Sequence, residues 1–262
     1  MQGPPPSEHP LDPGLLGVLA VDGERERAAA WAQRLGAPLL SAAPQAPGVV
    51  LRAGRPAALQ GTGPGAPRHP LAVDFTDPAW RRRLAGTSAR HDPLARAVGL
   101  HRRRGPAVVD ATAGLGRDAA VLAHLGAEVV ALEASPVLAA LLEEALARGR
   151  EAPVALERLS LRCGDLRRLL ATLPEACREI VYLDPMFPAG STRGGVGREA
   201  QILRALLPAE AQAPEAELLG HARAAATRRV VVKRSRRAPA LAGQAPTRSL
   251  HGRAVRFDLY ES

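Results

Sequence analysis

The stretch that decides the fold reads Ala107-Val-Val-Asp-Ala-Thr-Ala-Gly-Leu-Gly-Arg-Asp118. Its three leading apolar residues predict a short buried strand that ends at Asp110, and a turn with two glycines follows. Residues 118–125 have helical spacing, with Asp118 as the expected N-cap and Gly126 as the stop. A strand, a glycine turn and a helix in this order predict one unit of an α/β fold.

The same alternation of strand and helix continues to the end of the chain. Further strands are expected over residues 128–132, 159–162, 180–183, 229–232 and 254–260. Helices are expected to start at Pro136 and to cover residues 166–173 and 215–227. Strands that alternate with helices at this spacing require a parallel sheet with right-handed crossovers. The fold class predicted for this part of the chain is therefore α/β.

Acidic residues follow four of these strands. Asp110, Glu133 and Asp184 come directly at the strand ends, and Asp165 follows its strand by way of Gly164. Carboxyl ends of parallel strands lie at one edge of a sheet, where open α/β sheets place their ligands. The sequence therefore predicts a carboxylate-lined crevice for a ligand rich in hydroxyl and amine donors.

The glycine turn favours a nucleoside-containing cofactor. Gly114 and Gly116 allow the backbone to pass close to a ligand, and Glu133, 17 residues beyond Gly116, suits two ribose hydroxyls. The spacing also fits a dinucleotide fingerprint, and a turn needed only for packing remains an alternative. Asp110 before the glycines suits an amino group better than a pyrophosphate, which favours S-adenosylmethionine over a nicotinamide cofactor.

A second motif, Asp184-Pro-Met-Phe187, suggests the substrate. We interpret Asp184 and the carbonyl of Pro185 as acceptors for an exocyclic amine, and Phe187 as a ring that stacks on a base. The arrangement resembles the D/N-P-P-Y/F motif of amino-methyltransferases, with Met186 in place of the second proline. An ordinary Asp-Pro turn is the alternative.

The charge of the chain favours a polyanionic partner. The net charge is +9, which favours a partner rich in phosphates. Lys233 is the only lysine, so all the other lysine or arginine positions are arginines. A biased composition would also produce such an excess of arginine. We assign substrate contacts to two basic groups and to the motif above: Arg81, Arg82, Arg83, Lys233, Arg234, Met186 and Phe187. A solvated charged face is the alternative for Arg81–Arg83 beside Trp80.

Three regions are expected along the chain. Residues 1–14 predict a disordered tail, residues 15–70 a small α/β domain that ends in a linker, and residues 71–262 the main domain. A strand over 15–21, a helix over 24–35 and a hairpin of 49–52 with 57–60 are expected in the small domain. With no membrane-length apolar run, no basic leader, two cysteines and scattered histidines, we expect a cytoplasmic protein without disulfides or metal.

Taken together, these motifs resemble those of the ribosomal RNA small subunit methyltransferase J family. The resemblance rests on residues 110–119, 184–188, 229–234 and 256–260 and covers about residues 71–260. It implies a Rossmann-like class I methyltransferase sheet and methyl transfer from S-adenosylmethionine to N2 of a guanine in 16S rRNA. It also implies cofactor contacts at Arg117, Asp118, Glu133, Ala134, Gly164, Asp165 and Asp184.

The chain departs from this family in two places. The family usually has a serine pair where this chain has Gly164-Asp165, although an acid there suits the adenine amine. After Pro188 the family has a lysine-rich segment, whereas residues 189–198 here are glycine-rich with two arginines.

Three other functions stay open from the residues themselves. The first is an amino-methyltransferase that acts on DNA adenine or on a protein amide. The second is a nicotinamide-dependent oxidoreductase, and the third is an RNA-binding protein without activity on a degenerate methyltransferase fold.

Overall fold

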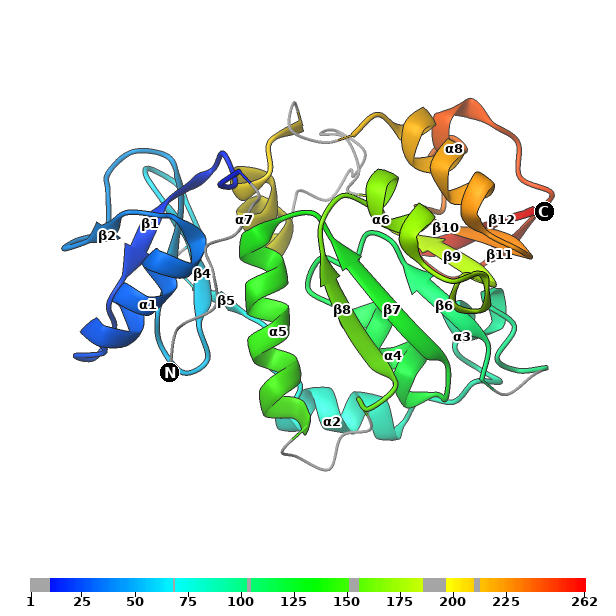
Figure 1. Ribbon diagram of the computed structural model, residues 1–262, viewed down its shortest axis with the longest axis horizontal. Helices are drawn as coiled ribbons and strands as arrows, with labels where there is room; N and C mark the ends of the chain where they lie inside the picture. Colours follow the sequence, from blue (N-terminus) through cyan, green and yellow to red (C-terminus); the bar gives the residue numbers. More distant parts are fainter. Residues whose placement is uncertain (1–9, 68, 103–104, 151–155, 186–196, 210–212) are drawn as a thin grey trace. The chain divides into compact units, whose positions relative to one another are not determined.

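The protein is described by a computed structural model in which the chain forms two compact units (Figure 1). The described residues are 10–67, 69–102, 105–150, 156–185, 197–209 and 213–262. Of these residues, the first unit comprises 10–67, 69–74, 135–145 and 197–209, and the second comprises 75–102, 105–134, 146–150, 156–185 and 213–262. The division passes through helix α5 (Pro136–Arg150). No described helix is long and apolar enough to cross a membrane.

The first unit contains a five-stranded sheet with the order β2-β1-β3-β4-β5. Its strands are β1 (Leu15–Leu19), β2 (Leu39–Leu40), β3 (Gly48–Arg52), β4 (Ala58–Thr62) and β5 (Leu71–Ala72). β2 and β3 run parallel to β1, whereas β4 is antiparallel to β3 and β5. Helices α1 (Arg25–Leu35) and α7 (Arg198–Leu206) pack on this sheet. The expected strand, helix and hairpin of this region are confirmed, with ends shifted by a few residues.

Residues 10–14 differ from the expected disordered tail. Asp12 is only 4% exposed, and its carboxylate accepts hydrogen bonds from Ser135 Oγ at 2.7 Å and from the Val137 amide at 3.1 Å. Burial raises the pKa of Asp12, and these two hydrogen bonds oppose the rise. The carboxylate caps the start of α5, so this part of the segment is bound to the first unit. Residues 1–9 lie outside the described part of the chain.

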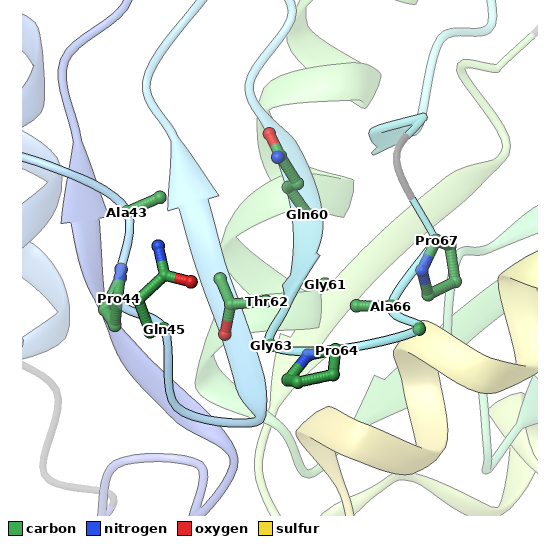
Figure 2. A pocket seen from close by; sticks show the side chains of 11 residues that line it. Ala43, Pro44, Gln45, Gln60, Gly61, Thr62, Gly63, Pro64, Ala66 and Pro67 are labelled. Carbon is green, nitrogen blue, oxygen red and sulfur yellow. The ribbon is translucent and has the colours of Figure 1, made fainter.

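Residues 61–70, expected to form a linker, instead connect β4 to β5 within one sheet. Figure 2 shows the pocket of about 410 Å³ that this connection forms with residues 43–45. The polar side chains that line it are Gln45, Gln60 and Thr62, and none of its lining residues is charged. The pocket therefore offers no acid, base or nucleophile with a perturbed pKa, and it is not a candidate for catalysis.

The second unit contains a seven-stranded sheet with the order β11-β12-β10-β9-β6-β7-β8. Its strands are β6 (Ala107–Asp110), β7 (Glu128–Glu133), β8 (Leu159–Cys163), β9 (Ile180–Leu183), β10 (Arg229–Ser235), β11 (Arg248–His251) and β12 (Val255–Glu261). The five strands from β8 to β10 are parallel, and β12 is antiparallel to both of its neighbours. The predicted α/β class with a Rossmann-like sheet is confirmed, and β11 is a strand that the sequence patterns did not indicate.

Helices cover both faces of this sheet. The helices of the second unit include α2 (Pro78–Ala85), α3 (Pro93–Ala97), α4 (Arg117–His124), α6 (Leu166–Thr172) and α8 (Glu215–Ala225), with short 3₁₀ helices at Glu175–Cys177 and Leu241–Gly243. α6 and α8 pack against each other and against β7, β9 and β10, where they enclose the main apolar core. All four residues of β9 are buried, as expected for a central parallel strand.

The start of α4 differs from the prediction. The helix begins at Arg117, and its N-cap is Gly116, whose φ of 69° lies in the left-handed region. Asp118 therefore lies inside the first turn and does not cap the helix, so its carboxylate is available for other contacts. A side chain at Gly116 would be strained by this backbone conformation.

Candidate functional site

Four charged side chains gather at the carboxyl ends of neighbouring strands in the second unit. Asp110 ends β6, Glu133 ends β7 and Asp184 follows β9. Lys233 lies on β10, which is paired with β9. From β6 the chain continues to β7 and β8 on one side of the sheet, and from β9 it continues to β10 on the other side. The gap between β6 and β9 is thus a topological switch point, where open α/β sheets bind their ligands. We call this group, together with Asp118, the strand-end site.

The glycine turn after β6 is held by the acid at the end of β7. The Gly114 amide donates a hydrogen bond of 2.6 Å to Glu133 Oε2. Gly114 has a φ of 54°, and a Cβ added to it would meet no atom within 4 Å. Glycine is therefore required here by the backbone conformation, and space lies open above the turn. The Gly164 amide donates to the Glu133 carbonyl at 2.8 Å, so Gly164 also lies at this edge.

Lys233 joins two acids of the site. Its Nζ lies 2.7 Å from Asp118 Oδ2 and 2.8 Å from Asp184 Oδ2. The Tyr182 hydroxyl donates to Asp118 Oδ2 at 2.6 Å. The Thr112 hydroxyl accepts the Asp184 amide at 2.7 Å, which ties the end of β9 to the glycine turn. Asp184 is thus held through both its side chain and its backbone.

Burial and neighbouring acids shift the pKa values of this group. Burial and the Asp118 carboxylate raise the pKa of Asp110 well above its usual value. Burial also raises the pKa of Asp184, while the Lys233 ammonium opposes that rise. Burial alone would lower the pKa of Lys233, but the two carboxylates outweigh it and raise it. The pKa of Tyr182 is raised by burial and by Asp118, so its hydroxyl remains a donor.

These shifts describe a site with an excess of negative charge. The strand-end site contains four acidic residues and one lysine, and Asp110 is only 1% exposed. Its carboxylate accepts one weak hydrogen bond of 3.3 Å, from the Thr112 amide. A cationic group that reaches Asp110 would offset the cost of burying this carboxylate. The site is therefore suited to a positively charged ligand.

Asp165 differs from its predicted role. Its Oδ1 accepts the Arg167 amide at 2.8 Å and caps α6, and Arg167 Nη2 lies 2.6 Å from its Oδ2. This hydrogen bonding holds the pKa of Asp165 below its usual value. The carboxylate is therefore already engaged by Arg167, which leaves less of it for an adenine amine than the sequence suggested.

Arg234 is not available to a substrate. Its side chain is 3% exposed, and its guanidinium donates to Glu215 Oε1 at 2.9 Å and to the Pro239 carbonyl at 3.1 Å. Side chains alternate between the two faces of a strand, so Arg234 points away from the face of Lys233. The predicted substrate contact of Arg234 is wrong, and its role is to hold α8 against β10.

The predicted arginines of α2 are exposed and lie elsewhere. Arg83 stacks on the Trp80 ring, with 5.2 Å between its Cζ and the ring centroid, and Asp77 caps the helix. Figure 1 shows α2 near the carboxyl end of α5, and a Cβ added at Gly149 would lie 3.5 Å from Phe75 Cβ, just before α2. The structure therefore does not bring Arg81, Arg82 and Arg83 to the strand-end site.

The remaining predicted residues are partly outside the described chain. Pro185 is buried directly after Asp184, Arg117 is half-buried at the start of α4, and Ala134 is exposed just after Glu133. Met186 and Phe187 lie outside the described residues, as does most of the glycine-rich segment after them.

Sequence reasoning missed two residues of the site. Tyr182 was interpreted only as part of an apolar strand, and Thr112 only as part of a glycine turn. The position of Thr112 could have been recognised from the sequence, because its hydroxyl follows the strand-end acid Asp110 by two residues and can reach the end of a neighbouring strand. Tyr182 carried none, because its partner Asp118 is 64 residues away.

Comparison with known proteins identifies relatives of this chain over nearly its full length. A family model described as "Putative SAM-dependent methyltransferase" matches residues 55–262. The chain is 57% identical over 256 residues to the ribosomal RNA small subunit methyltransferase J of Halorhodospira halophila, which covers 95% of each chain. It is 48% identical over 251 residues to the protein of the same name from Alkalilimnicola ehrlichii, covering 94% of this chain and 95% of the relative.

A solved structure shares the fold as well as the sequence. The crystal structure of a SAM-dependent methyltransferase from Neisseria gonorrhoeae matches with a TM-score of 0.70 at 33% identity. The match covers 94% of this chain and 95% of that one, so it includes both compact units.

Proposed function

Because this chain belongs to the ribosomal RNA small subunit methyltransferase J family, which is S-adenosylmethionine-dependent, we propose that it methylates the exocyclic N2 of a guanine in 16S rRNA. The names of the relatives support the small-subunit RNA as substrate. The choice of an exocyclic amine is supported by Asp184 and Pro185 at the end of β9. The nicotinamide-dependent oxidoreductase is set aside, since the family uses S-adenosylmethionine.

The strand-end site fits this cofactor. S-adenosylmethionine supplies a methyl group on a cationic sulfonium, and it also carries an α-ammonium and ribose hydroxyls. We assign the ammonium to Asp110, whose buried carboxylate lacks a compensating cation. We assign the ribose hydroxyls to Glu133, whose other task is to hold the glycine turn. The open space above Gly114 leaves the backbone accessible to the ligand.

The main support for the proposal is that Asp184 is fixed at two points, its carboxylate and its backbone amide. Lys233 fixes the carboxylate from β10, and Thr112 fixes the backbone amide from the glycine turn. A carboxylate held in this way next to a buried proline presents two acceptors, its own oxygen and the Pro185 carbonyl, in a fixed relation. Two acceptors match the two hydrogens of an amino group.

In this mechanism Asp184 orients the nucleophile. The lone pair of the guanine amine is delocalised into the ring, so the amine is a weak nucleophile. Hydrogen bonds from its two N–H groups to Asp184 and to the Pro185 carbonyl direct the lone pair toward the methyl group. A bound S-adenosylmethionine would supply the methyl group from its sulfonium, and the proton that the methylated nitrogen loses would pass to solvent. Asp184 must be ionised for this task, and Lys233, as a positioning residue, favours its ionised form.

Phe187 completes the proposed substrate contacts. An aromatic ring three residues beyond Asp184 suits stacking on a base that is unpaired or flipped out of the RNA. Lys233 is engaged by two carboxylates, so we assign it the positioning of Asp184 in place of the direct substrate contact expected from the sequence.

The test is transfer of tritiated methyl from S-adenosylmethionine to 30S subunits that lack the modification, followed by nucleoside analysis. We expect labelled N2-methylguanosine. In the Asp184→Ala variant we expect turnover to fall by about 100-fold or more, while S-adenosylhomocysteine still binds. Asp184→Asn keeps one acceptor oxygen and is the matched control, with a smaller loss.

Competing substrates separate the remaining alternatives. Duplex DNA and a protein extract are offered in place of 30S subunits under the same conditions. Label in N6-methyladenine or in a protein amide would contradict the RNA substrate while retaining the amino-methyltransferase. Near-normal turnover of Asp184→Ala would contradict the role of Asp184 itself.

A further inference from the structure

A second group of charged residues lies at the opposite end of the same sheet. A pocket of about 70 Å³ is lined by Arg96, Gly99, His101, Arg102, Arg228, Arg229, Arg248 and Leu250. We call it the arginine pocket. All of its residues belong to the second unit. Arg229 is the first residue of β10, four positions before Lys233, so the pocket lies about 13 Å along the strand from the strand-end site.

Three separate segments build the arginine pocket. Arg228 and Arg229 come from the start of β10, and Arg248 begins β11. Arg96 lies in the last turn of α3, which packs against β11 and β12, and Arg102 follows that helix. These segments are far apart in the sequence, so the cluster is a product of the sheet order and not of a local run of basic residues.

The charges in the arginine pocket are not balanced. Glu261 lies 3.2 Å from Arg229 and 3.7 Å from Arg248, and Glu179 accepts from Arg228 at 2.9 Å. Two carboxylates thus face five arginines, an excess of three positive charges. The exposed guanidinium groups of Arg96 and Arg102 have no ion-pair partner among the residues that the structure describes. Placing like charges together costs free energy that a bound anion would offset.

Arg229 forms the buried floor of the arginine pocket. Its side chain is 9% exposed, and its Nη1 donates to the Ala97 carbonyl at 3.4 Å. Its Nε makes no hydrogen bond within the described part of the chain, although the Glu261 carboxylate is nearby. Burial and the surrounding arginines also lower the pKa of His101, so at neutral pH the imidazole adds no further charge. The pocket thus combines a fixed, buried guanidinium with two free, exposed ones.

We propose that the arginine pocket binds a backbone phosphate of the RNA substrate, remote from the base that is methylated. Guanidinium groups bind phosphate oxygens through paired N–H donors, and arginine is preferred for such contacts. The small volume suits one phosphate group presented from outside and not a whole nucleotide. Arg96 and Arg102 are free to close on it from the rim.

This site extends the proposed function, because it rests on RNA being the substrate. A contact about 13 Å from the strand-end site would bind RNA without touching the reacting base. Such a contact contributes to affinity and to the placement of the substrate, but not to the chemical step. It therefore predicts a higher KM with an unchanged kcat when it is removed.

The experiment compares two double variants of the full chain. Arg96→Ala with Arg102→Ala removes the free arms of the arginine pocket. Arg25→Ala with Arg55→Ala removes two exposed arginines of the first unit and lowers the net charge equally. Binding to 16S rRNA is measured from 50 to 200 mM salt, and methyl transfer to 30S subunits gives KM and kcat.

We expect the pocket variant to bind RNA about tenfold more weakly, with a salt slope reduced by about 0.7–0.9, the value for one phosphate. KM should rise with little change in kcat, and the control variant should retain wild-type binding. Equal losses in both variants would overturn the proposal, since net charge alone would then explain them. An unchanged melting temperature of the pocket variant verifies that it folds.

Inorganic phosphate separates the RNA backbone from a free anion as the ligand. If millimolar phosphate raises the melting temperature of the wild type and not of the pocket variant, while RNA binding is equal in both, the pocket is a free-anion site and the RNA proposal is wrong. Absence of methyl transfer by the wild type would contradict the proposed function. The RNA-binding comparison would still decide the arginine pocket in that case.

Discussion

A partly or fully buried positive charge lies near each end of strand β10, and the two charges have opposite surroundings. Lys233, near the carboxyl end, lies between Asp118 and Asp184 within a group of four acids. Arg229, at the amino end, lies among four other arginines, and Glu261 is its one ion-pair partner in the part of the chain that the structure describes. One edge of the sheet is therefore prepared for a cation and the other has an excess of positive charge.

Under the two proposals made above, the two edges of the sheet would carry two kinds of binding. The acidic edge suits the cationic cofactor and the amine of the substrate, where orientation determines the rate. The basic edge suits the phosphate backbone, where charge determines affinity. Changes at the acidic edge should therefore act on turnover and on cofactor binding, and changes at the basic edge on RNA affinity.

Among variants of the residues around Asp184, the largest effect is expected from Lys233→Met. Without the ammonium, the interaction that opposes the raised pKa of Asp184 is lost, so that pKa rises further and ionisation requires a higher pH. We expect turnover at neutral pH to fall by about 10- to 100-fold and the acidic limb of the pH–kcat profile to move to higher pH. Lys233→Arg keeps the charge and should retain the profile. A lower kcat with an unmoved acidic limb would contradict this role.

A smaller effect is expected from Asp110→Asn, which should weaken cofactor binding but raise the stability of the fold at neutral pH. Loss of the carboxylate should weaken binding of S-adenosylhomocysteine about tenfold by calorimetry. The pKa of Asp110 is raised in the folded state, so wild-type stability falls as pH rises through that folded pKa. The variant lacks this fall, and its melting temperature should be higher at neutral pH and equal at strongly acidic pH. A lower melting temperature at neutral pH would contradict the assignment.

The smallest effect is expected from Tyr182→Phe. The change removes the 2.6 Å hydrogen bond to Asp118 while Lys233 still holds that carboxylate. We expect a loss of about 1 kcal/mol in the free energy of unfolding, or a melting temperature about 2–4 °C lower. Turnover should change less than in Lys233→Met. A larger loss of turnover here than in Lys233→Met would show that Tyr182, and not Lys233, positions the acidic pair.

Much of the strand-end site was predictable because its acids follow their strands directly. The period of the apolar residues identifies β6, β7 and β9, and the carboxyl ends of parallel strands must lie at one edge. The same reasoning failed for Arg234, because an uninterrupted apolar run before Lys233 does not reveal which face each later residue takes. It also did not reveal that Arg167 binds the Asp165 carboxylate, whose predicted adenine contact stays a prediction.

The segment of residues 61–70 shows a different limit. Glycine and proline indicate a break in regular structure, but they do not distinguish a linker between domains from a connection within one sheet. The pairing of β5 with β4 decides this, and it depends on which strand edge is open after folding. Asp12 is similar, since a proline-rich start gives no sign that a buried helix end requires a carboxylate.

By itself, the sequence determined the alternation of strands and helices, the acids at the strand ends, the glycine turn and the family. These properties are local, because propensity, periodicity and short motifs act within a few residues. Only the tertiary structure decided that Lys233 binds Asp118 and Asp184, which are 115 and 49 residues away, and that three separate segments form the arginine pocket. The physical reason is that the pairing of distant charges follows from the order of strands in the sheet, and no local pattern records that order.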